Sequence, residues 1–491
     1  MKHTKKLSAI IMTSLLLAAG CADNTATPGG STEIKESAPV TSENTGTSDN
    51  TLETKSVKDV VGDIKVDTKV KVLAWYDLNK TDTSETFKKP FGIPENVPEN
   101  YSNLSKDAQP FIDIAILNYS DRYTDLAKLI QSDDSPDCFP AEISMMPHTV
   151  IEQKFFQPID GVIDLELAEF APYANIQRST EMAGKNYVPI YKSAPITLLW
   201  YRSSVIESAG LEDPWELYEK DEWTWNKLLE MSEKFCGGKD DKYAIDGYKV
   251  ERGILNTTGK GILGTENGIF RSYVDDESVI KAMDFLRQFA TTQKGYRYPR
   301  ETENGWSPSY HEWASSNTLF FEDGVWRYDE NWRVYKQKNQ WSDNEINFVP
   351  FPRCDDEKTY YQGYNNTSAY MLVTGAKNTE GYKALVYSDV YAENDEELQK
   401  KNRENKKSEY DWNDNLLNRL DKINSPDAFE WVIDYRDATD PPAFYCGESY
   451  LSLLTNCSFM NGEDYRKFVT NGRYNIAEEF AKHAESLNKS E

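Results

Sequence analysis

A run of six apolar or β-branched residues, 196–201, lies near the middle of the chain between Pro195 and a polar Arg-Ser-Ser sequence. Such a run without alternation is typical of a strand that is buried on both faces. Ser204 and Glu207 have the spacing of a capping box, which predicts a short helix over 205–209. Gly210 then follows where a helix ends in the left-handed conformation. The pattern therefore predicts a strand, a cap, a short helix and a stop.

Further strands and helices are predicted along the remaining chain. Two further strands are predicted from their apolar positions, and four helices from apolar positions at helical spacing. The strands lie over 70–75 and 111–117, and the helices over 123–130, 225–235, 278–291 and 474–487. Between 81 and 110, four prolines interrupt any long helix, so the sequence does not predict how that part folds.

The first residues have the pattern of an export signal. Three lysines precede an apolar run over 7–19, which is too short to span a bilayer. The sequence Leu-Ala-Ala-Gly-Cys that ends at Cys21 resembles a bacterial lipobox. We therefore expect residues 1–20 to be a lipoprotein signal peptide and Cys21 to carry lipid, including a palmitate-type acyl chain. Residues 21–68 contain no aromatic residue and are mostly small and polar, which predicts a disordered tether.

The remaining length, roughly 420 residues, exceeds the size at which one hydrophobic core keeps growing, so two lobes are expected. The chain has 55 Lys and Arg against 81 Asp and Glu, a net charge of −26. This acidity argues against nucleic acid as a partner, and against any membrane contact other than the lipid anchor. It also favours neutral or cationic solutes slightly over anionic ones, although a charge that only keeps the protein soluble is an equal explanation.

Few residues suggest catalysis or metal binding. The mature chain would hold three histidines, and it contains none of the common catalytic or phosphate-binding motifs. The cysteines lack metal-ligand spacing, so we expect no metal and no cofactor. Cys446 and Cys457 could close a short disulfide loop, but the sequence leaves their state open.

Several segments in order resemble the extracellular solute-binding proteins of ABC importers, in the subfamily that mostly binds carbohydrates. They are Gly184-Lys-x-Tyr-x-Pro with the strand 196–201, the Trp-Thr-Trp at 223–225, Gln157-Pro-Ile-Asp, Phe320-Phe-Glu-Asp-Gly and Val349-Pro-Phe-Pro. The resemblance implies a two-lobed, periplasmic-binding-protein-like α/β fold with a central cleft and hinge. Its lobes would comprise 69–195 with 363–425, and 196–362 with 426–491.

The candidate ligand-binding residues follow from strand ends and from this resemblance. Side chains beyond the carboxyl ends of strands lie where open α/β sheets bind ligands. In carbohydrate-binding relatives a tryptophan shortly after the Phe-x-x-Gly turn often stacks on a sugar ring, a role that either Trp326 or Trp332 could fill. The candidates are Trp75, Tyr76, Asp77, Asn79, Glu142, Trp326, Trp332, Tyr364 and Asn365.

The sequence thus predicts a non-enzymatic lipoprotein, a monomer anchored on the outer face of the bacterial membrane. It would capture a neutral mono- or oligosaccharide by lobe closure and deliver it to ABC permease subunits. The alternative from another class is a surface glycosidase or lyase, because two placed carboxylates are enough for glycoside hydrolysis. An adhesin without a transport partner would share the same site.

Overall fold

The computed structural model describes most of the folded part of the chain. The described residues are 55–61, 64, 69–75, 112–239, 241–292, 300–302, 305–307, 309–364, 369–439, 463–471 and 476–489. The lipidation candidate Cys21, the tether, the proline-rich part over 81–110 and the cysteines 446 and 457 all lie outside them.

The first lobe is built on a four-stranded sheet with the order β13-β3-β1-β2. β1 runs parallel to β2 and β3, whereas β13 is antiparallel to β3. The strands are β1 Val70–Ala74, β2 Ile112–Ile116, β3 Cys138–Pro140 and β13 Tyr370–Leu372. The helices of this lobe are α1 Val57–Val60, η4 Tyr119–Asp121, α3 Arg122–Gln131, η5 Ile143–Met145, η6 Pro147–Glu152, η7 Ala171–Tyr173, α4 Ala174–Ser179 and α12 Thr379–Asn394.

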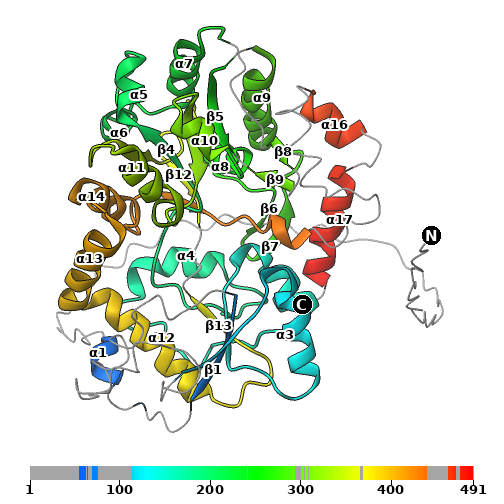
Figure 1. Ribbon diagram of the computed structural model, residues 1–491. Coiled ribbons are helices and arrows are strands. Elements are labelled where there is room, and N and C mark those ends of the chain that lie inside the picture. The colour runs from blue at the N-terminus through cyan, green and yellow to red at the C-terminus, as the bar shows by residue number, and fades with distance from the viewer. Residues whose placement is uncertain are drawn as a thin grey trace, which may run out of the picture. The chain divides into compact units, whose positions relative to one another are not determined.

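The second lobe has its own four-stranded sheet with the order β11-β4-β10-β5 (Figure 1). Its strands are β4 Leu198–Arg202, β5 Tyr243–Gly247, β10 Thr318–Asp323 and β11 Ile346–Val349. The helices packed on it are α5 Ser203–Ser208, α6 Pro214–Glu219, α7 Trp225–Cys236, α8 Val250–Asn256, α9 Glu277–Thr292, α10 Tyr310–Ala314, η8 Tyr328–Trp332, α11 Arg333–Asn339, α14 Asp414–Ile423 and α16 Tyr465–Asn471.

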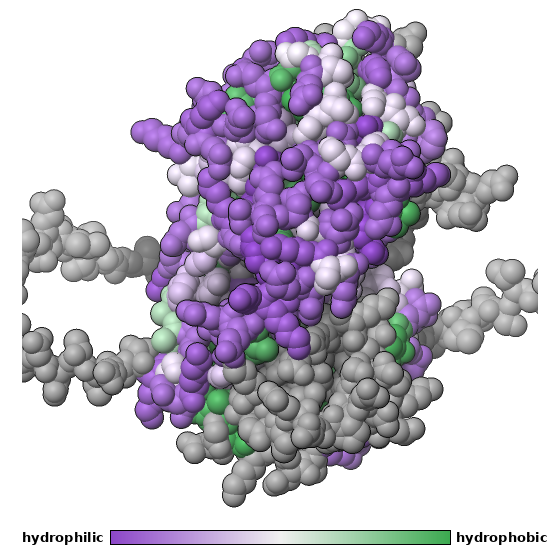
Figure 2. Space-filling model, turned by 60° about the vertical axis from the view of Figure 1, so that its left-hand side comes forward, coloured by the Kyte–Doolittle hydropathy of each residue, from purple (hydrophilic) through white to green (hydrophobic). Residues whose placement is uncertain are grey.

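The remaining elements are two hairpins, two short crossing strands and the helices that join the lobes. They are β6 Leu263–Glu266, β7 Ile269–Ser272, β8 Arg300–Thr302, β9 Gly305–Ser307, β12 Tyr361–Gly363, β14 Glu430–Val432, α13 Glu396–Tyr410, η9 Arg436–Thr439 and α17 Ile476–Lys489. On the face shown in Figure 2 the described surface is mainly hydrophilic, as expected for a chain with this excess of acidic residues.

Each lobe has a separate hydrophobic core. Val72, Phe139 and Leu372 lie in the first core, and Trp200, Phe320 and Phe348 lie in the second. Helix α17 contributes to both, because Phe480 packs in the second core and Leu487 in the first. Helix α14 also packs in the second core, so the chain returns to the second lobe before residue 425, which the sequence predicted as the boundary.

Three of the described segments that connect the cores lie side by side, and we call them the crossing segments. The first contains Ile196, whose amide donates to the Gly363 carbonyl at 2.8 Å, and Thr197. The second contains β12, which pairs in parallel with β14 of the third segment. Tyr364 then donates its amide to the Val432 carbonyl at 2.9 Å. These three segments therefore form one paired connection between the two cores.

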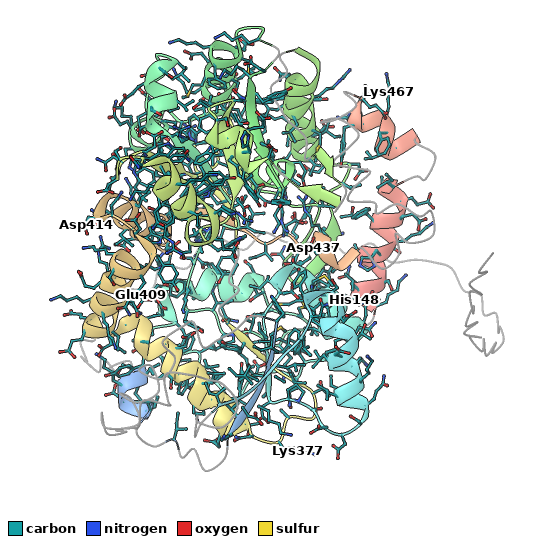
Figure 3. All side chains as sticks on the ribbon, viewed as in Figure 1. His148, Lys377, Glu409, Asp414, Asp437 and Lys467 are labelled. Atoms are coloured by element: carbon teal, nitrogen blue, oxygen red, sulfur yellow. The ribbon has the colours of Figure 1, made fainter. Side chains whose placement is uncertain are left out.

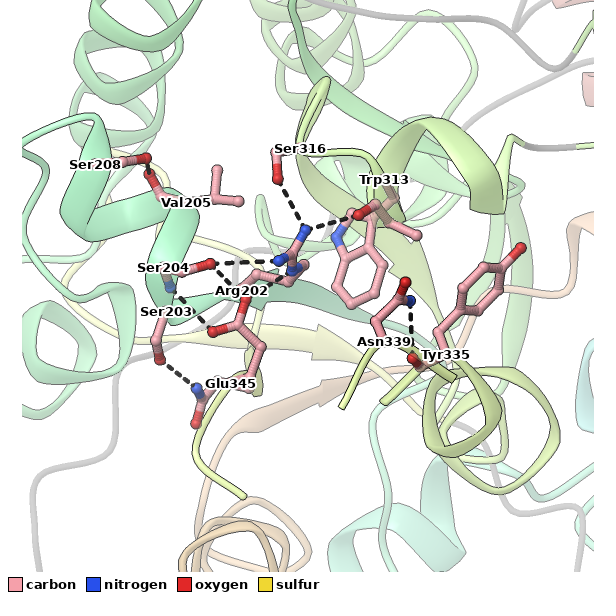
Figure 4. A network of polar contacts seen from close by, with 12 residues as sticks. Arg202, Ser203, Ser204, Val205, Ser208, Trp313, Ser316, Tyr335, Asn339 and Glu345 are labelled. Carbon is pink, nitrogen blue, oxygen red and sulfur yellow. Dashed lines mark hydrogen bonds and ion pairs between the residues drawn. The ribbon is translucent and has the colours of Figure 1, made fainter. Parts of the chain in front are cut away.

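The central strand and the helix after it form largely as predicted, with one correction. Gly210 has a φ of 63° and ends the turn after α5. Helix α5 begins at Ser203, however, so Ser204 lies inside it and does not cap it. The Ser204 hydroxyl instead donates to Glu345 at 2.5 Å (Figure 4). The predicted capping box is therefore wrong, because a buried carboxylate far along the chain takes this hydroxyl.

Candidate ligand-binding site

Glu142 follows β3 directly and is the centre of a polar cluster in the first lobe. Its carboxylate accepts from Arg122, whose Nε lies 2.6 Å from Oε2 and whose Nη2 lies 3.0 Å from Oε1. The Tyr123 hydroxyl donates to Oε2 at 2.5 Å, while the Tyr119 hydroxyl is 3.4 Å from Oε1. The Glu142 and Arg122 side chains are only 14% and 12% exposed. The Tyr119 contact is long for a hydrogen bond between two oxygens, so Tyr119 holds this carboxylate less firmly than Arg122 and Tyr123 do.

Aromatic rings surround the Arg122 guanidinium. Its central carbon lies 3.8 Å from the centroid of the Tyr119 ring, 4.6 Å from Tyr123 and 5.5 Å from Trp75. Trp75 and Tyr119 follow the parallel strands β1 and β2, so they meet at the same edge of the sheet as Glu142. Tyr119 is 54% exposed and presents a ring to solvent. Burial and the charge of Glu142 raise the pKa of Tyr119, so its hydroxyl remains a donor at neutral pH.

The second lobe presents two exposed aromatic rings after its parallel strands. Tyr248 follows β5 and Trp326 follows β10, and they are 47% and 42% exposed. The Tyr248 hydroxyl lies 3.1 Å from the Tyr310 hydroxyl. Gly324 permits the position of Trp326, because a Cβ on this glycine would come within 2.0 Å of the indole. These rings are flat apolar surfaces with hydroxyl groups nearby, as sugar stacking requires.

Two acidic residues end β10, and both are buried. Burial and the charge of Asp323 raise the pKa of Glu322 to about 7, although hydrogen bonds from Thr197 and from the Lys249 amide act in the other direction. Burial also raises the pKa of Asp323, while Arg327 opposes this rise with its Nε 2.6 Å from the carboxylate. Asp323 thus has a cationic partner, whereas Glu322 accepts hydrogen bonds from a neutral hydroxyl and a neutral amide.

Asp437, in η9 after the third crossing segment, interacts with residues of both lobes. It forms an ion pair with Arg252 of α8 at 3.2 Å. Although its burial acts to raise the pKa of Asp437, Arg252 and a hydrogen bond from Ser144 lower it overall. The charge of Asp437 also acts on Tyr119 in the first lobe. Figure 3 labels Asp437 between the upper and lower parts of the ribbon, where residues from both lobes meet.

The structure brings some predicted site residues together and separates others. Trp75 and Glu142 lie in one cluster, and Trp326 is exposed in the second lobe. Trp332 is fully buried, with its ring centroid 4.1 Å from that of Trp313, so it has no ring face for a ligand. This corrects the choice between the two tryptophans, because the turn through η8 directs Trp332 into the second core.

Tyr364 has a structural position in the crossing segments. It is 5% exposed, and its hydroxyl donates to the Lys192 carbonyl at 2.8 Å. Its expected contact with ligand therefore stays a prediction. The candidates Tyr76, Asp77, Asn79 and Asn365 lie outside the described residues.

Sequence reasoning missed four residues of this site, namely Tyr119, Arg122, Tyr248 and Asp437. The rule that selected Trp75 could have found two of them, since Tyr119 and Tyr248 also follow strands at their carboxyl ends. Arg122 and Asp437 gave no local signal, because their roles depend on Glu142 and Arg252, which lie far from them in the sequence.

The described residues show neither a metal site nor a membrane span. No group of three or more His, Cys, Asp or Glu among them is arranged to hold a metal ion. In the same part of the chain, every helix is too short or too polar to cross a membrane. Cys138, Cys236 and Cys354 are buried free thiols.

Comparison with known families matches residues 112–397 to the bacterial extracellular solute-binding proteins. This range is more than half of the 491 residues. The chain belongs to this family. The family that the sequence segments resemble is therefore confirmed for this solute-binding protein. Among curated protein sequences, none matches it.

Solved structures support the same fold. The sugar-binding protein MalE from Xanthomonas citri is 14% identical and superimposes with a TM-score of 0.60, covering 86% of this chain and 100% of its own. The GacH receptor of Streptomyces glaucescens, solved with acarbose, is 12% identical with a TM-score of 0.54, covering 87% and 99%. The cyclic alpha-maltosyl-1,6-maltose binding protein from Arthrobacter globiformis is 12% identical with a TM-score of 0.52, covering 86% and 100%. The predicted two-lobed, periplasmic-binding-protein-like fold is confirmed.

Proposed function

We propose that this solute-binding protein captures a neutral oligosaccharide or monosaccharide between its lobes. The observation that carries the proposal is that charged side chains around the candidate site are paired within the protein, next to exposed aromatic rings. The pairs are Glu142 with Arg122, Asp437 with Arg252 and Asp323 with Arg327. Paired carboxylates still accept hydrogen bonds from hydroxyl groups, but their charge no longer selects for a cation. The site therefore suits polyhydroxylated, uncharged ligands.

The exposed aromatic rings provide apolar contacts to the sugar, in addition to the hydrogen bonds of the paired carboxylates. Tyr119 on the first lobe and Tyr248 and Trp326 on the second present flat surfaces that suit the apolar faces of pyranose rings. Because these rings belong to different lobes, a sugar that contacts both walls favours the closed arrangement over the open one. Closure about the three crossing segments then couples binding to a shape that a permease can recognise.

The proposed setting follows from the leader and the family. The protein would be exported, lipidated at Cys21 and held as a monomer on the outer face of the cell membrane, where it delivers its ligand to ABC permease subunits. The ligand leaves chemically unchanged, since the protein acts by binding. The test for the anchor is metabolic labelling with a palmitate analogue, with Cys21→Ala as the control that should lose the label.

A thermal-shift screen tests the ligand class. Purified residues 22–491 would be heated with maltose, maltotriose, acarbose, other neutral glycans, amino-acid pools and peptide pools. A ligand that binds only the native state raises the melting temperature, so at least one neutral glycan should do so while the other pools do not. Chromatography of the glycan after incubation should recover it intact. A shift with amino acids alone contradicts the proposed ligand, and cleaved glycan supports the enzyme alternative.

A further inference from the structure

Glu322 joins two segments of the second lobe through one buried carboxylate. The residue is 1% exposed. Its Oε1 accepts a short hydrogen bond from the hydroxyl of Thr197, which belongs to the first crossing segment. Its Oε2 accepts the backbone amide of Lys249 at 2.5 Å, in the loop between β5 and α8. A single side chain therefore ties the loop after β5 to the segment about which the lobes connect.

Gly247 shows that the loop is fitted closely to this carboxylate. Its φ is 148°, a conformation that other residues rarely adopt. A Cβ at this position would lie 2.5 Å from the Glu322 Cβ and 2.6 Å from its Oε2. Gly247 and Glu322 thus occupy complementary space, and the loop has no room to settle closer to β10.

The loop held by Glu322 carries Tyr248, which is one of the exposed rings of the candidate site. It also carries Lys249, whose positive charge acts on Asp323 and Asp437. The position of the loop therefore decides where this aromatic surface meets a ligand, and for that step the inference rests on the proposed function.

We propose that Glu322 is a positioning residue whose protonation state sets the order of the 247–249 loop, so that ligand capture is linked to proton binding. The ionised carboxylate accepts both hydrogen bonds, and an acceptor that carries charge binds its donors more strongly than a neutral one. The Lys249 amide can only donate, whereas the Thr197 hydroxyl can also accept, so a proton is favoured on Oε1, where it reverses the bond to Thr197. The Lys249 amide then faces a neutral acceptor, and the loop is held less firmly.

The groups around Glu322 determine how readily it takes this proton. Asp323, the next residue on β10, favours the protonated form, although its charge is compensated by Arg327. Lys249 on the loop and the Thr197 hydroxyl favour the ionised form. Asp246 at the end of β5 is also buried, and it accepts the amides of Gly247 and Ser309. With burial as the largest cause, the pKa of Glu322 is raised to about 7, so the change falls near neutral pH.

Hydrogen exchange measured on the free protein tests the positioning role without any ligand. Exchange of the peptide over 247–252 would be followed from pH 5.5 to 8.5 and corrected for the intrinsic rates. We expect protection at the Lys249 amide to rise about tenfold with a midpoint near neutral pH, while helix α7 in the same lobe shows no such step. Glu322→Gln should give the low protection at every pH. A wild-type profile without a step, or an unchanged step in this variant, would overturn the proposal.

Thr197 provides a second pair of variants. Thr197→Val removes a donor that favours the ionised carboxylate, so the midpoint should move to higher pH, whereas Thr197→Ser keeps the donor and should keep the midpoint. Equal midpoints in the two variants would contradict the proposed bond.

Titration with maltotriose and acarbose adds the functional arm. The sugar that binds should bind more weakly at pH 5.5 than at pH 8.5 in wild type, and with little pH dependence in Glu322→Gln. The same pH dependence in both proteins overturns the link to capture. If neither sugar binds while the exchange step is present, the choice of ligand fails and the positioning role of Glu322 stands.

Discussion

At the scale of single residues, two of the buried ion pairs among the described residues have similar geometry but different settings. Arg122 and Glu142 lie among exposed aromatic rings in the first lobe. Arg202 and Glu345 lie at the end of the central strand, where Nε and Oε1 are 2.7 Å apart and both side chains are 9% exposed (Figure 4). Arg202 also donates to the Ala314 carbonyl at 2.8 Å. We propose that the first pair meets a ligand, whereas the second holds the second lobe together.

Replacing each arginine separates these two roles. Arg122→Met and Arg202→Met both leave a buried carboxylate without its partner, so each should lower the free energy of unfolding by about 3 kcal/mol. Only Arg122→Met should also weaken sugar binding, by about tenfold or more, because Glu142 loses its orientation. Denaturant titration and calorimetry with the best glycan from the thermal screen would measure the two effects. Equal losses of affinity in both variants would place the site elsewhere.

The titration of Glu322 predicts a specific dependence of stability on pH. Its pKa is about 7 in the folded protein against an ordinary value of 4.5, so the folded state binds this proton more tightly than the unfolded state. The contribution of Glu322 to stability therefore rises as pH falls from about 8 to about 5. Glu322→Gln removes this dependence, and it should be more stable than wild type by about 1–3 kcal/mol at pH 8, with a smaller difference at pH 5.

Unfolding curves of both proteins across this pH range would measure the difference between their free energies of unfolding. The contributions of all other titrating groups cancel in this difference. A difference between them that stays constant with pH would show that Glu322 does not titrate in the range.

At the scale of elements, the ends of the parallel strands decide what the loops can present. In both lobes these ends carry the exposed rings, after β2 in the first lobe and after β5 and β10 in the second. The loop after β5 begins at a glycine that is fitted closely to its surroundings, because Gly247 packs against Glu322. The hairpin turn at Gly268 is a useful contrast, since its φ is 76° but nothing lies near the position of a Cβ.

Alanine at these two glycines should therefore cost different amounts. Gly268→Ala pays only for the backbone conformation, about 1 kcal/mol. Gly247→Ala also forces a Cβ into Glu322, which should bring the loss of unfolding free energy to about 3 kcal/mol. Thermal unfolding of both variants measures this, and a loss at Gly268 as large as that at Gly247 would show that the fit against Glu322 is not what matters.

Element boundaries could be predicted where local signals set them. Helix α7 begins after Thr224, whose side chain accepts the Lys227 amide, and it ends at Gly237 with a φ of 50°. Prediction failed where a distant contact decided the outcome. Ser204 bonds to Glu345 and so does not cap α5. Prediction also failed for the strands β12 and β14, because three residues are too few to show a hydrophobic periodicity.

The candidate site was predictable only in part for the same reason. The strand-end rule selects Trp75 and Glu142 from the sequence, but it cannot tell which of two tryptophans after Gly324 faces outward. That choice depends on the path of η8, which buries Trp332 against Trp313. The role of Asp437 depends on the third crossing segment, which brings it to Arg252.

At the scale of the whole molecule, two cores and three crossing segments account for the proposed function. Separate cores allow each lobe to stay rigid, and the crossings are short strands that pair with one another. Helix α17 packs in both cores, and Asn488 near its end exchanges hydrogen bonds with Phe270 of β7 at 2.8 and 3.1 Å. We therefore expect the proposed closing motion to be limited by contacts at the crossings and at this helix.

The central claim is that one sugar is held by both lobes at once, and isothermal titration calorimetry tests it most directly. The glycan identified in the thermal screen would be titrated into wild type, Tyr119→Ala, Trp326→Ala, the double variant of these two and Trp332→Phe. We predict one binding event in wild type, about tenfold weaker binding with either of the first two changes, and unchanged affinity with the buried Trp332→Phe control. Full affinity after both exposed rings are removed together would contradict the account.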